Sequence, residues 1–195
     1  MGPARQHPHV SGDWVAYALR YDRLPGRAVA LRAEVTVHPD TPVVSHSLHP
    51  GFEFGVTLAG EHERTFPGLV LPTQTGDVWL TCAWELHGYR QTAKGPTVVW
   101  MVFTPEFLGE ETLAGVPWLS LFAAPSAQRP RVNTPQLRAR VLAIGREMQE
   151  EIGVRKPGWE GAVRLHLLRL LLALRREWEP PPTHLRAGVT PATAM

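Results

Sequence analysis

Two segments of alternating apolar and polar residues most strongly restrict the fold of this chain. Every second residue is apolar from Val29 to Val37 and again from Phe52 to Leu58. Because the side chains of a β-strand point alternately to opposite faces, this period of two predicts strands with one buried face. Abundant proline and glycine, 19 and 17 residues, divide the first half into short segments. Several short strands at this spacing predict a β-sandwich or a β-barrel.

A different periodicity in the second half of the chain indicates helices. Asn133 or Thr134 can cap a helix, and Pro135 suits its first turn. The Pro157-Gly158 pair would end this helix. Apolar residues recur between these limits at steps of three or four, as on one face of an amphipathic helix: Leu137, Val141, Ile144, Met148 and Ile152.

A second helix is predicted from about Trp159 to Trp178, and leucines occupy much of its circumference. A helix that is apolar on several sides must be covered on more than one of them. The first helix can cover one side, and a barrel face or a second copy of the chain would cover the rest. Together the patterns predict a flexible arm at residues 1–13, a β-barrel at 14–104, an irregular connector at 105–133, a helical hairpin at 134–178 and a disordered tail at 179–195.

Composition and charge limit the possible cellular location of the chain and the kinds of partner it can bind. The net charge is only +2 among 195 residues, and no concentrated basic stripe lies outside one helix, which argues against nucleic-acid binding by this chain itself. The single cysteine, Cys82, excludes an intrachain disulfide. The first residues lack the apolar stretch of a secretory signal, and the leucine-rich run at 165–174 is too short to span a bilayer. We therefore expect a cytoplasmic protein without a membrane partner.

Histidine is the residue type most suggestive of a site. His49 and Glu53 are separated by three residues that include Pro-Gly, so a tight bend can bring the two side chains together. His87 begins a later predicted strand. Two imidazoles and a carboxylate that converge in a barrel suit a divalent ion such as Zn, Fe, Mn or Ni. If the face that Glu53 shares with Thr57 looks into the barrel, a small polar pocket results.

These residues carry a resemblance to a known superfamily. The spacing His49-x3-Glu53-x6-Gly60 is similar to the first cupin motif, and the stretch from Gly76 to His87 resembles the second. More narrowly, these segments and the leucine-rich helix pair resemble the N-terminal ligand-binding and dimerisation domain of AraC-family transcription regulators. The resemblance covers roughly residues 29–178. It implies a mainly β chain: a cupin-type double-stranded β-helix, or jelly-roll barrel, followed by a C-terminal two-helix hairpin that forms a homodimer.

The sequence departs from the cupin pattern at several ligand positions. Ser47 stands where cupins have the first histidine, and His46, one place away, is an alternative ligand only if the loop shifts. Cys82 and Trp84 replace the usual proline and glycine of the second motif. At best three of the four ligands are present. The alternative to a metal site is a polar pocket in which the three residues bond to each other or to water.

Other residues are candidates for a ligand pocket or for the surface. Trp79, Trp84 and Tyr89 can stack on a bound small molecule, with Thr57 on the polar wall, or can simply pack in the core. His46 and His62 are expected on the surface or in loops. We assign no catalytic residue, because no nucleophile signature, phosphate loop or paired-cysteine zinc motif is present.

The leading hypothesis is an effector-sensing and dimerisation domain of an AraC-like regulator rather than an enzyme. Only thirteen residues follow Pro182, so DNA contact is expected only through a separate or missing helix-turn-helix domain. The first alternative is a metal-dependent cupin enzyme that acts on a small polar metabolite. The second is a stand-alone cupin binding protein without a DNA partner.

Overall fold

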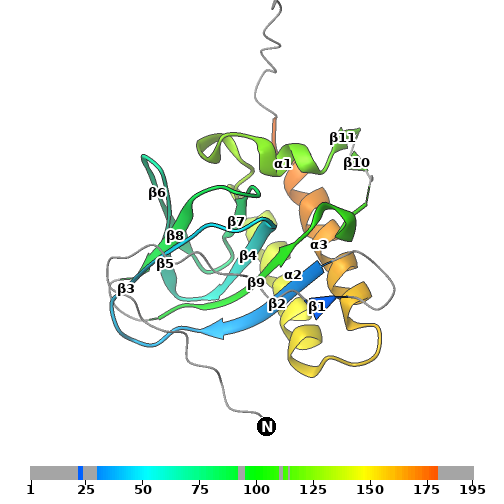
Figure 1. Cartoon of the computed structure of the whole chain (residues 1–195), viewed down its shortest axis with the longest axis horizontal. Coiled ribbons are helices and arrows are strands. Elements are labelled where there is room, and N and C mark those ends of the chain that lie inside the picture. Colours follow the sequence, from blue (N-terminus) through cyan, green and yellow to red (C-terminus); the bar gives the residue numbers. More distant parts are fainter. Residues whose placement is uncertain (1–21, 24–29, 92–94, 110–111, 114, 180–195) are drawn as a thin grey trace, which may run out of the picture.

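A computed structural model describes residues 22–23, 30–91, 95–109, 112–113 and 115–179. The predicted N-terminal arm and almost all of the predicted C-terminal tail lie outside these residues. The described part consists of two antiparallel β-sheets that face each other, with a pair of long helices against one of them (Figure 1). This arrangement is the predicted barrel followed by the predicted helical hairpin.

The two sheets contain the strands that the alternation predicts. The first sheet has the order β1 (Asp22–Arg23), β2 (Ala30–Val37), β9 (Thr97–Phe103), β4 (Phe52–Ala59) and β7 (Val78–Thr81). The second has the order β3 (Val43–Ser47), β8 (His87–Gln91), β5 (Glu61–Phe66) and β6 (Leu69–Gln74). Strand β6 forms one edge of the second sheet and carries the exposed Pro72 in its middle, opposite Glu63 of β5.

The predicted helices are present, and their ends follow the predicted signals. They are α2 (Pro135–Val154) and α3 (Trp159–Arg176). The Thr134 hydroxyl accepts a hydrogen bond from the backbone N–H of Leu137 at 3.1 Å, so Thr134 is the cap. Arg155 ends α2 in the left-handed conformation, and Gly158, at φ 90°, precedes α3. Between barrel and hairpin lie η1 (Pro105–Phe107), β10 (Thr112–Leu113), β11 (Val116–Pro117), α1 (Leu119–Ala123) and η2 (Ser126–Gln128).

The main hydrophobic core lies between the first sheet and the helices. The apolar face of β4, which includes Phe54 and Val56, is fully buried against this layer. Gly145 allows α2 to approach β4 closely, because a Cβ atom there would lie 3.0 Å from side-chain atoms of Leu58 and Val56. The opposite face of this sheet, which does not contact the helices, therefore lines the inside of the barrel.

Helix α3 is covered on two sides, as its composition predicts. It packs on α2 and contacts β10 of the connector. Arg164 ties it to the connector by donating to the carbonyls of Phe107 and Leu108 at 2.8 and 3.0 Å. Leu165 nevertheless remains 60% exposed. Within the described residues, no helix is long and apolar enough to cross a membrane.

Replacing Gly145 with leucine is expected to lower the free energy of unfolding by about 1–3 kcal/mol, because the new side chain must displace Leu58 and Val56. Gly153→Leu is the matched control, since Gly153 lies in the same helix with open space around it. Urea denaturation measures both variants. Equal stability of the two would contradict the close seating of α2 on β4.

Candidate functional site

The polar face of β4 is buried inside the barrel. Glu53 and Thr57 are 7% and 0% exposed, and they alternate with the residues that face the helices. The indole of Trp79 lies across Gly55 of the same face, where a Cβ atom would come within 2.0 Å of the ring. Gly55 therefore makes room for Trp79, the residue opposite it on β7. The predicted polar face on this strand is confirmed.

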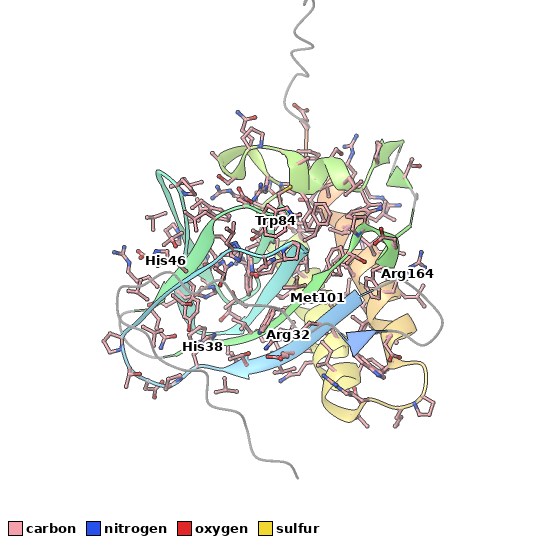
Figure 2. The ribbon with its side chains drawn as sticks, in the orientation of Figure 1. Arg32, His38, His46, Trp84, Met101 and Arg164 are labelled. Atoms are coloured by element: carbon pink, nitrogen blue, oxygen red, sulfur yellow. The ribbon has the colours of Figure 1, made fainter. Side chains whose placement is uncertain are left out.

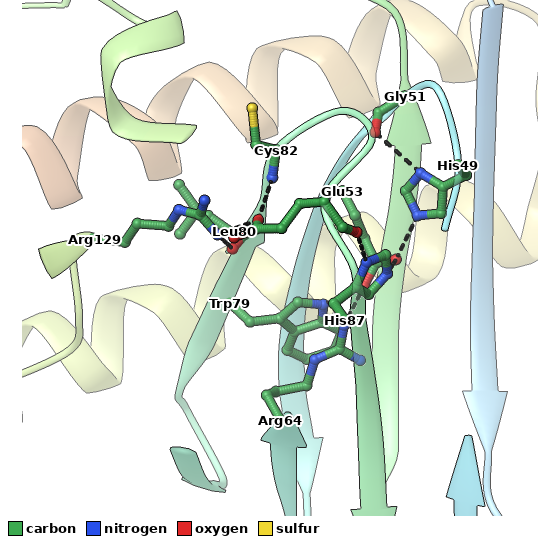
Figure 3. Close-up of polar contacts among 10 residues, drawn as sticks. His49, Gly51, Glu53, Arg64, Trp79, Leu80, Cys82, His87 and Arg129 are labelled. Carbon is green, nitrogen blue, oxygen red and sulfur yellow. Dashed lines mark hydrogen bonds and ion pairs between the residues drawn. The ribbon is translucent and has the colours of Figure 1, made fainter. Parts of the chain in front are cut away.

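The Glu53 carboxylate is the centre of the polar contacts in the barrel (Figure 3). Its Oε1 accepts hydrogen bonds from Arg64 Nη2 at 2.8 Å and from Trp79 Nε1 at 2.6 Å. Its Oε2 lies 3.2 Å from His49 Nε2 and 3.1 Å from His87 Nε2. The structure thus brings together the three residues that the sequence proposes as metal ligands.

Backbone contacts fix the orientation of both imidazole rings. His49 Nδ1 lies 3.0 Å from the carbonyl oxygen of Gly51, and His87 Nδ1 lies 2.8 Å from that of Glu85. A carbonyl oxygen can only accept a hydrogen bond, so each Nδ1 carries a hydrogen. In a neutral ring, Nε2 then presents a lone pair. Both lone pairs point toward an anionic oxygen, and this arrangement needs a positive charge between them.

A divalent metal ion satisfies this requirement for all three groups at once. Ligand atoms about 2.1 Å from a metal, at tetrahedral or octahedral angles, are about 3.0–3.4 Å apart. The two nitrogen–oxygen distances of 3.1 and 3.2 Å fall in this range. A backbone carbonyl that accepts from the second ring nitrogen is typical of a metal-ligating histidine. All three ligand atoms lie within 4.8 Å of one another, so the residues fit a metal.

The charge state of Glu53 favours ligation. Burial alone would raise the pKa of this carboxyl, but the Arg64 guanidinium holds the pKa of Glu53 well below its usual range. The carboxylate is therefore ionised at neutral pH and needs no deprotonation to bind a cation.

The local chain path explains how these residues meet. His49 lies in the short loop between β3 and β4, where Pro50 and Gly51 form the predicted bend. His87 is the first residue of β8, as expected, and it pairs with Ser47 of β3. The backbone N–H of Trp84 donates to the His49 carbonyl at 2.8 Å, so the β7–β8 turn and the His49 loop are tied together.

The remaining predicted site residues lie in different surroundings. His46 is exposed on β3 and is not part of the ligand group, because successive residues of a strand face opposite sides (Figure 2). Trp84 is 67% exposed in the β7–β8 turn and is not brought into the barrel interior. Tyr89 is half-buried opposite Arg64, and its ring packs 4.8 Å from that of His38.

The expectation that His62 lies on the surface is wrong, and Arg64 was not predicted at all. His62, Arg64 and Phe66 occupy alternate positions of β5 and are all buried. The rings of His62 and Trp79 lie nearly perpendicular to each other at a centroid distance of 5.5 Å. The sequence does contain a signal for this face, because side chains at every second position of a strand point the same way. The apolar Phe66 therefore indicates that Arg64 and His62 also face inward.

Several polar atoms on the buried face of the barrel strands have no hydrogen-bond partner among the described residues. They are Thr57 Oγ1, His62 Nδ1, Arg64 Nε, Thr81 Oγ1 and Gln91 Oε1. Buried polar groups are normally paired with protein, water or a ligand. The barrel interior therefore offers donors and acceptors to a polar occupant.

The comparisons with known proteins concern the fold. No protein-family model matches the chain, and no curated protein is detectably similar. The AraC-like transcriptional activator CuxR matches with a TM-score of 0.51 and 14% identity, over 81% of this chain and 56% of that protein. This chain thus spans a little over half the length of CuxR.

Two further solved structures match over smaller parts. An uncharacterized conserved protein from Klebsiella pneumoniae with a double-stranded β-helix domain has a TM-score of 0.32 and 24% identity, over 40% of this chain and 67% of that one. Bacillus subtilis oxalate decarboxylase, which has Mn(II) centres, has a TM-score of 0.35 and 15% identity, over 46% and 26%. The fold of two facing antiparallel sheets followed by a helix pair is the jelly-roll barrel with a C-terminal hairpin that the sequence predicts, and CuxR shares it.

We expect the purified protein, after incubation with Zn²⁺, Mn²⁺, Fe²⁺ or Ni²⁺ and dialysis, to retain about one ion per chain. His87→Ala is expected to lose the ion because one of three ligands is removed. His46→Ala, which changes an exposed histidine, should retain it. Elemental analysis measures all three proteins. Folded wild-type protein without metal would contradict the metal site and leave a hydrogen-bonded pocket.

The free energy of unfolding is also expected to decrease as the pH is lowered, because of His62. Burial, followed by the charges of Arg64 and His38, lowers the pKa of His62 from 6.5 to about 3. Between these values the unfolded chain binds a proton at His62 and the folded chain does not. Stability therefore decreases by about 1.4 kcal/mol for each unit of falling pH.

His62→Gln should remove this contribution, while His46→Gln should leave it in place. Urea denaturation of metal-free protein at a series of pH values measures the slope. An unchanged slope in His62→Gln would exclude a buried neutral histidine at this position.

Proposed function

We propose that this chain is the effector-sensing and dimerisation part of an AraC-like transcription regulator. The observation that carries the proposal is the extent of the likeness to the activator CuxR, over 81% of the chain. Strands β2 to β9 span only residues 30–103, so the likeness includes the connector and the helices. A barrel with this particular pair of helices is a more specific combination than the barrel alone.

The proposed effector is a small polar molecule inside the barrel. The unpartnered atoms of Thr57, Thr81 and Gln91 would bond to it, and the indole of Trp79 supplies a flat surface beside them. Hydrogen bonds to otherwise unpaired buried groups favour a ligand with hydroxyl, amide or carboxylate groups over an apolar one.

Strand β4 connects this interior to the helices. Its polar face carries Glu53 and Thr57, and its apolar face carries Val56 and Leu58, which contact α2 at Gly145. A shift of β4 on effector binding would therefore move the side chains that contact α2. Effector binding then favours one of two arrangements of the helices, which a DNA-binding domain elsewhere would read.

A second copy of the chain is the proposed partner of α3. Leu165, Leu168 and Leu172 lie at steps of three and four on this helix, with Leu165 exposed and the other two half-buried. Such a stripe matches the spacing at which helices pack against each other. Pairing through this stripe would cover the side of α3 that neither α2 nor the connector covers.

Leu165→Glu is expected to weaken dimerisation by about tenfold or more, because a charge would enter an apolar helix interface. Val154→Glu is the matched control: Val154 is 58% exposed against 60% for Leu165, and it lies at the end of α2. Sedimentation equilibrium measures the dimer Kd of both variants. Wild-type protein that stays monomeric at high concentration would contradict the proposal, as would an unchanged Kd in Leu165→Glu.

A metal-dependent enzyme is the second candidate, and the ligand group favours it. Three protein ligands leave coordination positions open, and a metal bound there would polarise a substrate oxygen or lower the pKa of a bound water. Arg64 and Trp79 hold the Glu53 carboxylate in position through its other oxygen. Turnover of a small carboxylate or hydroxy compound by metal-loaded wild type, absent in His87→Ala, would favour this function over the regulator.

A further inference from the structure

A cleft lies at the seam between the two sheets. Strands β6 and β7 are edge strands of different sheets, joined by the turn at Gly76 and Asp77. Residues of the 126–138 segment, which leads into α2, form the opposite wall of the cleft. The cavity between them has a volume of about 190 Å³, against the roughly 10–15 Å³ that one water molecule needs. It has room for a small organic or inorganic ion.

Four arginines line this cavity, which we call the arginine cleft: Arg64, Arg129, Arg131 and Arg138. Arg129 Nη1 lies 2.6 Å from Glu85 and donates to the carbonyl of Leu80 at 2.8 Å. Arg138 Nη1 donates to Asp77 at 2.8 Å. These contacts hold the guanidinium groups in place before any ligand arrives, which lowers the entropic cost of binding.

Two aromatic rings also support the guanidinium groups. Arg64 lies over the ring of Trp79 at 4.7 Å, and Arg129 lies over the ring of Phe66 at 5.7 Å. Both rings line the cleft together with the arginines. Stacking of this kind fixes the plane of a guanidinium group while its N–H donors remain available at the edge.

Donor capacity remains in the cleft after the internal contacts are counted. Arg64 Nε is buried and has no partner among the described residues. The contacts of Arg129 use Nε and Nη1 and leave Nη2 for a ligand. Arg131 is exposed and has no ionic partner within the part of the chain that the structure describes. Carboxylates pair with three of the four arginines, and one of these carboxylates, Asp77, also lines the cleft. The cleft therefore combines free N–H donors with the one positive charge of Arg131 that no described carboxylate balances.

We propose that the arginine cleft binds a small oxyanion, a carboxylate or phosphate group, at a site separate from the His49–Glu53–His87 group. Guanidinium groups bind such anions through charge-assisted, often bidentate hydrogen bonds. None of the three proposed metal ligands lines the cavity, although Arg64 and Trp79 line it and also donate to Oε1 of Glu53. The anion site therefore requires neither a metal nor the regulatory role proposed above.

The position of the cleft gives its occupancy a structural consequence. Arg138 belongs to the first turns of α2, whereas Arg64 belongs to β5 and Arg129 to the segment between them. An anion in the cleft would lie in a cavity that all three parts line. It would strengthen the attachment of α2 to the barrel at the end where Arg138 already donates to Asp77 and to the carbonyl of Thr75.

The test uses the whole 195-residue chain freed of metal by a chelator and then dialysed, so that coordination to a metal cannot account for binding. Inorganic phosphate is titrated while the assigned indole N–H signals are followed by NMR, with sodium chloride at equal ionic strength as the reference. We expect a saturable shift of the Trp79 signal, because this ring lines the cleft, and no such shift of the exposed Trp84. A parallel titration with acetate distinguishes carboxylate from phosphate, and saturation by either one supports the proposal.

Arg131→Gln should weaken phosphate binding by about tenfold, the loss of one charge-assisted hydrogen bond. Both Arg131 and the control, Arg146→Gln on the exposed face of α2, are surface positions, so neither change disturbs the core. Arg146→Gln should bind like wild type. Shifts no larger than those caused by chloride would overturn the proposal, as would unchanged affinity in Arg131→Gln.

Discussion

Burial of both faces of β4 is the constraint from which most of the structure follows. One face is apolar and is covered by α2, so the helices are required for the barrel to hide its own surface. The other face carries a carboxylate inside the barrel, where an isolated charge would be very costly. The strand therefore needs a hydrophobic partner on one side and a set of charged or polar partners on the other, and the rest of the chain supplies both.

The partners of Glu53 come from both sheets. Trp79 belongs to the same sheet as Glu53, whereas Arg64 and His87 belong to the facing sheet, and His49 lies in the loop that connects them. The carboxylate is thus a polar crosslink in a barrel whose large apolar cluster lies on its outside. The same contacts that compensate its charge also place two imidazole nitrogens beside it, so the structural role and the proposed ligand role of Glu53 have one origin.

The strands, the helix pair and the ligand group could be predicted because each leaves a local pattern. The alternation around β4, the cap at Thr134 and the spacing of His49 and Glu53 are all visible in the sequence. Arg64 and His62 were harder to place, because charged residues on a short strand usually face solvent and Phe66 is the single apolar residue that marks their face of β5. The arginine cleft could not be predicted, because it joins β5 to a segment more than sixty positions later and no local pattern links the two.

Pro72, in the middle of edge strand β6, limits how copies of this protein can associate. A proline is accepted in a sheet only where its nitrogen faces away from the neighbouring strand, so the free side of β6 lacks a backbone donor there. Another chain cannot extend the sheet along this edge with a regular ladder of hydrogen bonds. The pyrrolidine ring of Pro72 therefore disfavours edge-to-edge growth, the usual route from open sheets to fibrils, at this edge.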